Sequence, residues 1–178
     1  MPIYNPGAPF VITARFDDVR SYGRHGGIDF AAPRGTPIPC AVQGIVVGRG
    51  EHATYGNMAV VKHDDPTTQM DEFTLYAHMP GLCFIPAIGT AVERGQAIGL
   101  VGNTGDSTDA HLHFELVWAV AGTWLTLDNP YEGGRLPRPS TVGRLDPLIE
   151  ANWYGMDVYQ ASDDAGPVSR PAWSCRAA

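Results

Sequence analysis

The sequence predicts a mainly β fold with little helix. Its 178 residues include 21 glycines and 15 prolines, which favours short strands joined by turns. Several segments alternate apolar and polar residues, as half-buried strands do, and none before residue 140 resembles a long helix. With 44% apolar residues, the chain can bury the core of one domain.

The expected elements follow from the alternation and from the turn residues between them. A first strand is expected over residues 10–16, ending in a polar turn at Asp17 and Asp18. Residues 33–50 predict a loop, a short strand, a turn at Gly44 and another strand. Further strands are expected over 58–63, 73–79 and 110–116, with a turn-rich meander over 81–100. Residues 121–144 predict an irregular loop, followed by a short terminal element over 145–149.

Domain boundaries follow from the change in composition near residue 150. We expect one domain over 1–150 and an irregular or weakly packed tail over 151–178, in which Asp, Ser, Gly, Pro and Ala dominate from about residue 155. The aromatic residues Trp153, Tyr154 and Trp173 could bind a cell wall, but packing of the tail is the preferred interpretation.

The charge and the absence of long apolar runs exclude several classes of partner. A formal net charge of −7 argues against nucleic acid and against simple capture by an anionic membrane or wall. No 18-residue apolar run occurs, and the N-terminus lacks the pattern of a signal peptide. We therefore expect synthesis in the cytoplasm without membrane insertion, although an excised domain would look the same.

Cys40, Cys83 and Cys175 have no metal-type spacing and are interpreted as reduced or incidental.

The strongest local pattern is Ala-His-Leu-His-Phe-Glu-Leu at 110–116. Because successive side chains of a strand face opposite sides, His111, His113 and Glu115 share one face. The apolar residues between them bury the other face and fix the register. Two neighbouring imidazoles are either two metal ligands or one ligand beside a catalytic base.

A second histidine pattern is Arg-His-Gly-Gly-Ile-Asp at 24–29. In an extended chain His25 and Asp29 share a face, and imidazole and carboxylate are both zinc ligands. Gly26 and Gly27 leave room for a close approach to the backbone. The alternative is a turn with a surface histidine and a capping aspartate.

The other candidate groups are weaker. His78 lies near the end of a predicted strand, where a histidine is more often packed than catalytic, and His52 and His63 are interpreted as surface residues. Residues 102–109 form a Gly/Asp/Ser loop that precedes a strand, which excludes the helix-linked type of phosphate site. Asp106 and Asp109 lack the spacing of an EF-hand and are interpreted as solvated carboxylates.

Together, five residues form the pattern of a hydrolytic zinc site with three protein ligands, an open position for water and additional imidazoles. These residues are His25, Asp29, His78, His111 and His113.

Five ordered motifs also resemble the lysostaphin/LytM-type zinc metallopeptidases, over residues 12–118. They are Arg-His-Gly-Gly-Ile-Asp (24–29), Tyr-Gly-Asn-Met-Ala-Val-Val-Lys-His (55–63), Thr-Leu-Tyr-Ala-His-Met (74–79), Val-Glu-Arg-Gly-Gln-Ala-Ile-Gly (92–99) and the segment 102–116. Leu-Asp-Pro at 145–147 is similar to the closing motif of that family.

The resemblance implies a barrel-sandwich-like antiparallel fold with a loop-walled groove and a peptidoglycan peptide as substrate. It further implies that His25, Asp29 and His113 bind Zn²⁺, and that His78 and His111 are catalytic histidines that bind no metal. His111 would take the proton of the attacking water and later pass it to the leaving amine, and His78 would orient the water or stabilise the oxyanion.

Three positions depart from the pattern of the resembled family. Asp109 and Asp17 stand where that family usually has glycine, and the connection 119–144 is longer than usual. None removes a predicted ligand or catalytic histidine, so an active enzyme is expected.

The resemblance therefore predicts a monomeric zinc endopeptidase that cleaves bacterial peptidoglycan. A phage endolysin that acts on the wall from inside an infected cell is the hypothesis that fits the lack of a signal-peptide pattern. A catalytically silent binding or regulatory domain of the same fold is the alternative. An unrelated amidohydrolase with a His-x-His pair is disfavoured, because it would need helices between its strands.

Overall fold

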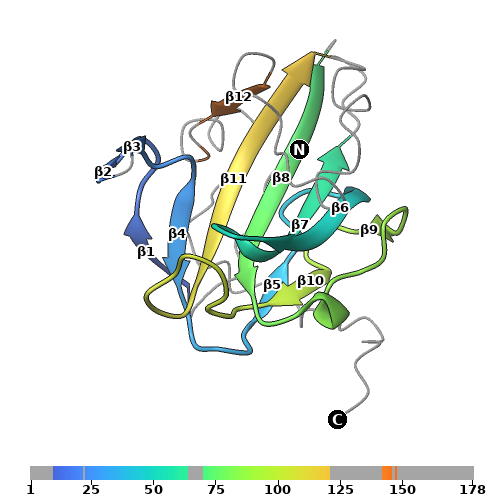
Figure 1. Ribbon diagram of the computed structural model, residues 1–178. Coiled ribbons are helices and arrows are strands. Elements are labelled where there is room, and N and C mark those ends of the chain that lie inside the picture. Colours follow the sequence, from blue (N-terminus) through green and yellow to red (C-terminus); the bar gives the residue numbers. More distant parts are fainter. Residues whose placement is uncertain (1–9, 22, 64–69, 121–141, 146, 148–178) are drawn as a thin grey trace.

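A computed structural model describes residues 10–21, 23–63, 70–120, 142–145 and 147, and these residues form mainly antiparallel β-sheet with little helix (Figure 1). The main sheet has eight strands, and the spatial order of seven is β1, β4, β11, β8, β7, β6, β9. Their bounds are Val11–Ala14, Ile28–Ala31, His111–Val120, Met70–Met79, Gly56–His63, Gly44–His52 and Ala91–Val92. The predicted fold class is confirmed.

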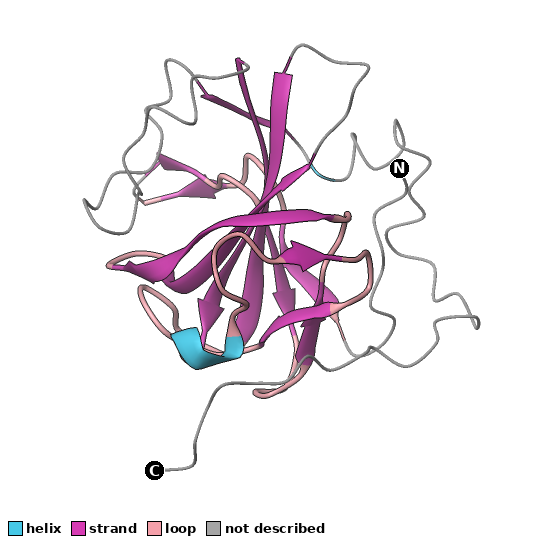
Figure 2. Ribbon diagram, turned by 90° about the vertical axis from the view of Figure 1, so that its right-hand side faces the viewer, coloured by secondary structure: helices cyan, strands magenta, loops and turns pink. Residues whose placement is uncertain are grey.

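Smaller elements complete the described fold. Strand β12 (Val142–Leu145) pairs with the upper half of β11, beyond the end of β4. Strands β5 (Pro37–Pro39) and β10 (Ala97–Leu100) form one two-stranded sheet, and β2 (Val19–Arg20) and β3 (Gly23–Arg24) form another. A 3-10 turn, η1, covers Leu82–Phe84. Figure 1 shows the hairpin β2–β3 at the outer side of β4 and β1, and Figure 2 shows that strands make up almost all of the described chain.

Strand β11 joins the two halves of the main sheet. It pairs with β4 on one side and β8 on the other, so that His113 lies opposite both Asp29 and Ala77. Directly paired residues point to the same face of a sheet. His113 and Asp29 therefore share a face, while Phe114 and its partner Tyr76 share the other.

The two faces of the main sheet bury different apolar clusters. Phe114, Tyr76 and Leu112 belong to the larger cluster, which includes Ile38 of β5 and Ile98 of β10. The smaller cluster lies on the face of His113. Its buried residues are Met58, Val60, Phe73, Leu75, Ala77, Val117 and Ala119. The alternation of β11 thus fixes which side chains enter the core and which remain available on the other face.

Two elements differ in extent from the sequence-based expectation. The first strand ends at Ala14 rather than at residue 16, because the chain turns at Asp17, whose φ of 66° is left-handed. Glycine adopts that conformation without strain, which explains why glycine is usual there. Residues 142–144, expected within a loop, and Leu145, expected to begin a terminal element, form β12 because β11 offers a free edge beyond β4. The expected tail over 151–178 lies outside the described residues.

The interpretation of His63 as a surface residue is wrong. Its side chain is buried, with Nδ1 2.8 Å from the backbone oxygen of Gln43 and Nε2 2.9 Å from the hydroxyl of Thr74. Thr74 in turn lies 2.9 Å from the hydroxyl of Tyr76. A buried polar side chain needs such partners, and these lie 11 and 20 residues away in the sequence.

The cysteines divide into two kinds. Cys40 is a free, buried thiol, as expected. Cys83 is disulfide-bonded, which corrects the expectation. Pairing depends on distance in the folded chain, which the sequence spacing does not give.

No helix of the described residues combines the length and the apolar character needed to cross a bilayer.

Candidate active site

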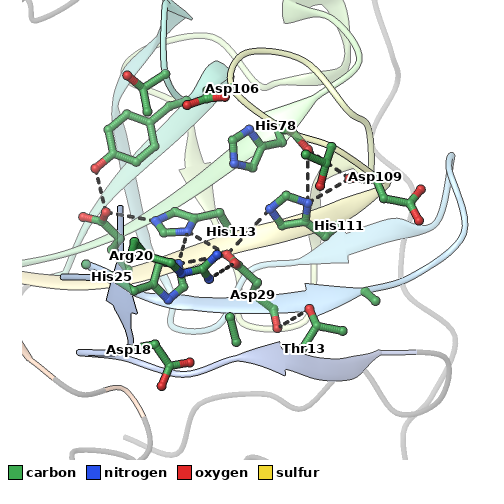
Figure 3. A pocket seen from close by; sticks show the side chains of 18 of the residues that line it. Thr13, Asp18, Arg20, His25, Asp29, His78, Asp106, Asp109, His111 and His113 are labelled. Atoms are coloured by element: carbon green, nitrogen blue, oxygen red, sulfur yellow. Dashed lines mark hydrogen bonds and ion pairs between the residues drawn. The ribbon is translucent and has the colours of Figure 1, made fainter. Parts of the chain in front are cut away.

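The predicted site residues line one groove of about 910 Å³. The hairpin β2–β3 borders it through Val19, Arg20 and Arg24, and the loop 102–110 borders it through Asp106 and Asp109. Figure 3 shows His25, Asp29 and His113 turned toward one another, with His78 and His111 on the side of Asp106 and Asp109.

Three potential ligand atoms meet at one point of this groove. Oδ1 of Asp29 lies 2.8 Å from Nδ1 of His113 and 3.1 Å from Nε2 of His25, and the two nitrogens are 3.1 Å apart. The edges of a tetrahedron around zinc, with ligand bonds of about 2.0 Å, measure about 3.3 Å. The donor set of two imidazoles and one carboxylate, and its spacing, therefore fit Zn²⁺.

The local sequence explains why these atoms meet. The register of β4 against β11 places Asp29 beside His113, and His25 precedes β4 by a short segment that contains Gly27. A Cβ atom at Gly27 would lie 2.2 Å from the backbone oxygen of Phe114. The glycine therefore allows this segment to pack directly against β11, which brings His25 to the other two residues.

Hydrogen bonds on the far side of each ring select the nitrogen that faces the centre. Nδ1 of His25 lies 2.8 Å from the backbone oxygen of Arg15, which can only accept, so Nδ1 carries the proton and Nε2 is left for a metal. Nε2 of His113 lies 3.0 Å from Oε1 of Glu115, which leaves Nδ1 for the metal. The hydroxyl of Tyr55 donates to the same Oε1 at 2.6 Å. Metal-binding histidines are commonly oriented in this way.

The second oxygen of Asp29 has its own partner. Arg20, in the hairpin β2–β3, donates to Oδ2 at 3.0 Å, while Oδ1 faces the two histidines. This arrangement presents a single oxygen of the carboxylate to the centre.

Without metal, the pKa values of Asp29 and His113 are shifted in opposite directions. Burial by itself would raise the pKa of Asp29, but hydrogen bonds from His113 and His25 hold it far below its usual range. Burial by itself would lower the pKa of His113, but hydrogen bonds to Asp29 and Glu115 raise it to about 9. Without metal, Asp29 is ionised and His113 protonated at neutral pH.

His111 points its Nε2 atom toward the centre, 3.6 Å from Oδ1 of Asp29. Its Nδ1 atom lies 2.9 Å from the backbone oxygen of Asp109 and 3.2 Å from the hydroxyl of Ser107. Because the carbonyl can only accept, Nδ1 carries the proton of the neutral ring and Nε2 offers a lone pair. Asp109 thus orients His111 through its backbone, while its side chain accepts from the amide of Ala110 at 2.7 Å.

His78 lies beside His111, with ring centroids 4.5 Å apart. Its Nδ1 atom donates to the backbone oxygen of Thr104 at 2.8 Å, so Nε2 offers a second lone pair. Burial lowers the pKa of His78 to about 4, which keeps the ring neutral near pH 7. Two imidazoles whose Nδ1 atoms are engaged by backbone carbonyls therefore stand next to the three potential ligands, an arrangement able to bind and deprotonate a water molecule.

The structure brings together all five residues selected from the sequence. It also assigns contacts to residues that the sequence reasoning did not select, namely Arg20, Tyr55, Thr104 and Glu115. For Glu115 a signal was present, because a carboxylate two residues after His113 shares its face. Arg20 and Thr104 carried no such signal, since their partners are set by the turns between strands.

The chain matches a known protein family. Residues 23–124, more than half of the chain, match the model of Peptidase family M23. The DD-carboxypeptidase/endopeptidase Mpg of Neisseria meningitidis is 42% identical over 91 residues, or 51% of this chain and 19% of that protein. The peptidoglycan DD-endopeptidase ShyA of Vibrio cholerae is 43% identical over 93 residues, or 52% and 20%. The chain spans about a fifth of the length of these curated relatives.

Solved structures share the fold. The catalytic domain of lysostaphin from Staphylococcus simulans superimposes with a TM-score of 0.61 at 24% identity, over 80% of this chain and 92% of that one. A variant catalytic domain of the prophage-encoded M23 protein EnpA from Enterococcus faecalis gives 0.54 at 35% identity, over 68% and 87%. A zinc-containing peptidase from Vibrio cholerae gives 0.55 at 32% identity, over 64% and 36%.

Proposed function

Because this chain belongs to Peptidase family M23, a family of zinc metallopeptidases, we propose that it is a zinc-dependent endopeptidase that hydrolyses peptide bonds of bacterial peptidoglycan. The observation that carries the proposal is the convergence of three potential ligand atoms, 2.8–3.1 Å apart, beside two further imidazoles in one groove. A catalytically silent domain would have no need of this complete set.

In this proposal His25, Asp29 and His113 hold the metal through Nε2, Oδ1 and Nδ1 respectively. Bound zinc polarises the scissile carbonyl and lowers the pKa of a water molecule from about 15.7 toward 7. The backbone oxygen of Arg15 and the carboxylate of Glu115 keep the two rings in the required tautomers. Arg20 holds the remaining oxygen of Asp29.

His111 is the proposed general base. Its Nε2 lone pair faces the ligand group, and its Nδ1–H is anchored on Asp109. It takes a proton from the attacking water and then carries that proton on Nε2, from where it can pass to the nitrogen of the leaving amine.

His78 is proposed to orient the attacking water by accepting its second hydrogen. Its only ring proton is held by Thr104, so the neutral ring has no N–H to offer an oxyanion. The low pKa of His78 disfavours the protonated form that could donate. Of the two roles that the sequence left open, orientation of the water is therefore preferred over oxyanion stabilisation.

The proposed substrate is a D,D-type peptide cross-link or a stem peptide of peptidoglycan. The names of the two curated relatives at 42% and 43% identity support a D,D-bond, whereas lysostaphin at 24% identity supports the fold alone. A lytic enzyme of phage origin is the finer form of the proposal, supported by 35% identity with prophage-encoded EnpA. Since one chain supplies all five site residues, we propose that a monomer is sufficient.

The test is digestion of two purified peptidoglycans, one directly cross-linked and one glycine-bridged. The zinc-loaded chain and its His111→Ala variant are compared, and new termini are identified by mass spectrometry. We expect cleavage of the direct cross-link by the parent chain alone. Cleavage of the glycine bridge would correct the substrate, and no cleavage of either wall with zinc bound would support a silent binding domain.

A further inference from the structure

His78 reaches the groove only because strand β8 is irregular. Ala77 lies opposite His113 and shares its face of the sheet, while Tyr76 belongs to the larger core cluster on the other face. In a regular strand the next residue would again face the core. The imidazole of His78 instead lies on the groove side, and Met79 packs in the core cluster.

A β-bulge causes this change. Asn57 pairs with Met79 and Ala59 pairs with Tyr76, so two steps along β7 correspond to three along β8. The extra residue reverses the alternation and turns a side chain to the other face. His78 has a φ of 62°, in the left-handed region, which is strained for a residue other than glycine and must be held by its surroundings.

Thr104 contacts both strands at the bulge. Its hydroxyl accepts from the amide of Asn57 at 2.9 Å and donates to the backbone oxygen of Met79 at 2.6 Å. Its own carbonyl accepts the Nδ1–H of His78 at 2.8 Å. The amide of His78 donates to the backbone oxygen of Tyr55 at 2.8 Å, which holds the other side of the same residue.

The backbone around Thr104 also fits closely against the start of β7. A Cβ atom at Gly56, whose φ is 61°, would lie 2.2 Å from the Thr104 hydroxyl and 2.4 Å from its carbonyl carbon. The loop that carries Thr104 continues to Ser107 and Asp109, which hold His111. A shift of Thr104 would therefore move both catalytic histidines.

We propose that Thr104 is the positioning residue for His78: its hydroxyl pins the bulge between Asn57 and Met79, and its carbonyl fixes the ring so that Nε2 faces the groove. The effect on hydrolysis rests on the proposed function, in which His78 orients the attacking water. The geometric part of the proposal does not depend on activity.

The test compares three substitutions in the full chain. Thr104→Val removes the hydroxyl and keeps the shape, Thr104→Ser keeps the hydroxyl, and Thr90→Val makes the same change at an exposed threonine outside the groove. Each zinc-loaded variant is assayed for kcat and KM on soluble cross-linked muropeptides, for zinc content, and for the Nδ1–H signal of His78 by NMR.

We expect Thr104→Val to lower kcat about 10- to 100-fold, because small displacements of positioned groups have effects of this size. Its KM and zinc content should stay unchanged, and its His78 Nδ1–H signal should broaden through exchange with water. Thr104→Ser and Thr90→Val should behave as the parent. If Thr104→Val does not fold, Thr104→Ala removes the hydroxyl with less bulk and replaces it.

Two results would overturn the proposal. One is a hydroxyl-free variant with parental kcat and a parental His78 signal. The other is an equal loss of kcat, zinc and thermal stability in Thr104→Val and Thr104→Ser, which would indicate a merely structural role. If the parent itself cleaves nothing, the proposed function fails, and the NMR comparison alone still decides whether Thr104 positions His78.

Discussion

The Nε2 atom of His113 lies 3.0 Å from Oε1 of Glu115, a carboxylate whose residue is only 1% exposed. Both side chains project from the same face of β11, and Tyr55 donates a second hydrogen bond to the same oxygen. A buried carboxylate in this position holds the ring with Nδ1 toward Asp29 and raises the basicity of that nitrogen.

Glu115→Gln should therefore weaken zinc binding while the fold is retained. The amide oxygen can still accept from His113, but the negative charge is lost, and changes of this kind lower metal affinity by about 10- to 100-fold. Competition with a chromogenic chelator measures the change. Glu51→Gln, at an exposed carboxylate outside the groove, is the control, and equal affinity for both variants would contradict the role of Glu115.

Substitutions should separate the proposed ligands from the proposed base. Asp29→Ala and His113→Ala should lose both bound zinc and hydrolysis, since each removes one of three ligand atoms. His111→Ala should keep zinc and lose hydrolysis by about 10²- to 10⁴-fold, the usual contribution of a general base. Metal content by atomic absorption decides the matter, and equal zinc loss in all three variants would refute the division of roles.

Zinc binding should release protons in a pH-dependent way. The pKa of His113 is about 9 in the metal-free site, so its ring must lose a proton before Nδ1 can bind zinc at neutral pH. We expect release of about one proton from this ring near pH 7, falling toward zero as the pH rises past its pKa. Calorimetry in buffers of different ionisation enthalpy measures the release, and a value independent of pH would contradict the prediction.

Much of this site could be predicted because the residue pattern of β11 by itself indicates a strand and the face on which each side chain lies. The alternation of Leu112 and Phe114 with His111 and His113 fixes strand, register and face from the sequence alone. The bulge at His78 could not be predicted from the pattern of its own strand, because the residues that stabilise it, Tyr55 and Thr104, come from two turns elsewhere in the sequence. The buried side chain of His63 was missed for a similar reason, since its partners lie on separate elements.

Gly27→Ala should destabilise the chain strongly. The added Cβ would lie 2.2 Å from the backbone oxygen of Phe114, in a place where neither strand can move without disturbing the sheet. We expect a loss of about 3 kcal/mol or more in the free energy of unfolding. Gly81→Ala, whose Cβ would meet its nearest neighbour at 3.8 Å, should be tolerated, and similar melting temperatures for the two variants would contradict this packing.

The thiol of Cys40 should resist alkylation in the folded chain. It is 0% exposed, and burial raises its pKa to about 11, so almost no reactive thiolate is present near neutral pH. Mass spectrometry of the Cys40 peptide after iodoacetamide treatment should show modification only when denaturant is added. Rapid modification of this peptide without denaturant would show that the cluster around it opens readily.

The position of β11 between β4 and β8 determines which strand brings in the last of the candidate metal ligands. In the described sheet β4 and β8 are not paired with each other. Strand β11, which follows both of them in the sequence, pairs with each and so joins them. A nascent chain that stops before residue 111 carries the carboxylate and one imidazole of the metal centre but lacks the third ligand. The strand that joins the two halves of the sheet is therefore also the strand that supplies the third candidate ligand, so the sheet cannot be joined between β4 and β8 without bringing the candidate ligand atoms together.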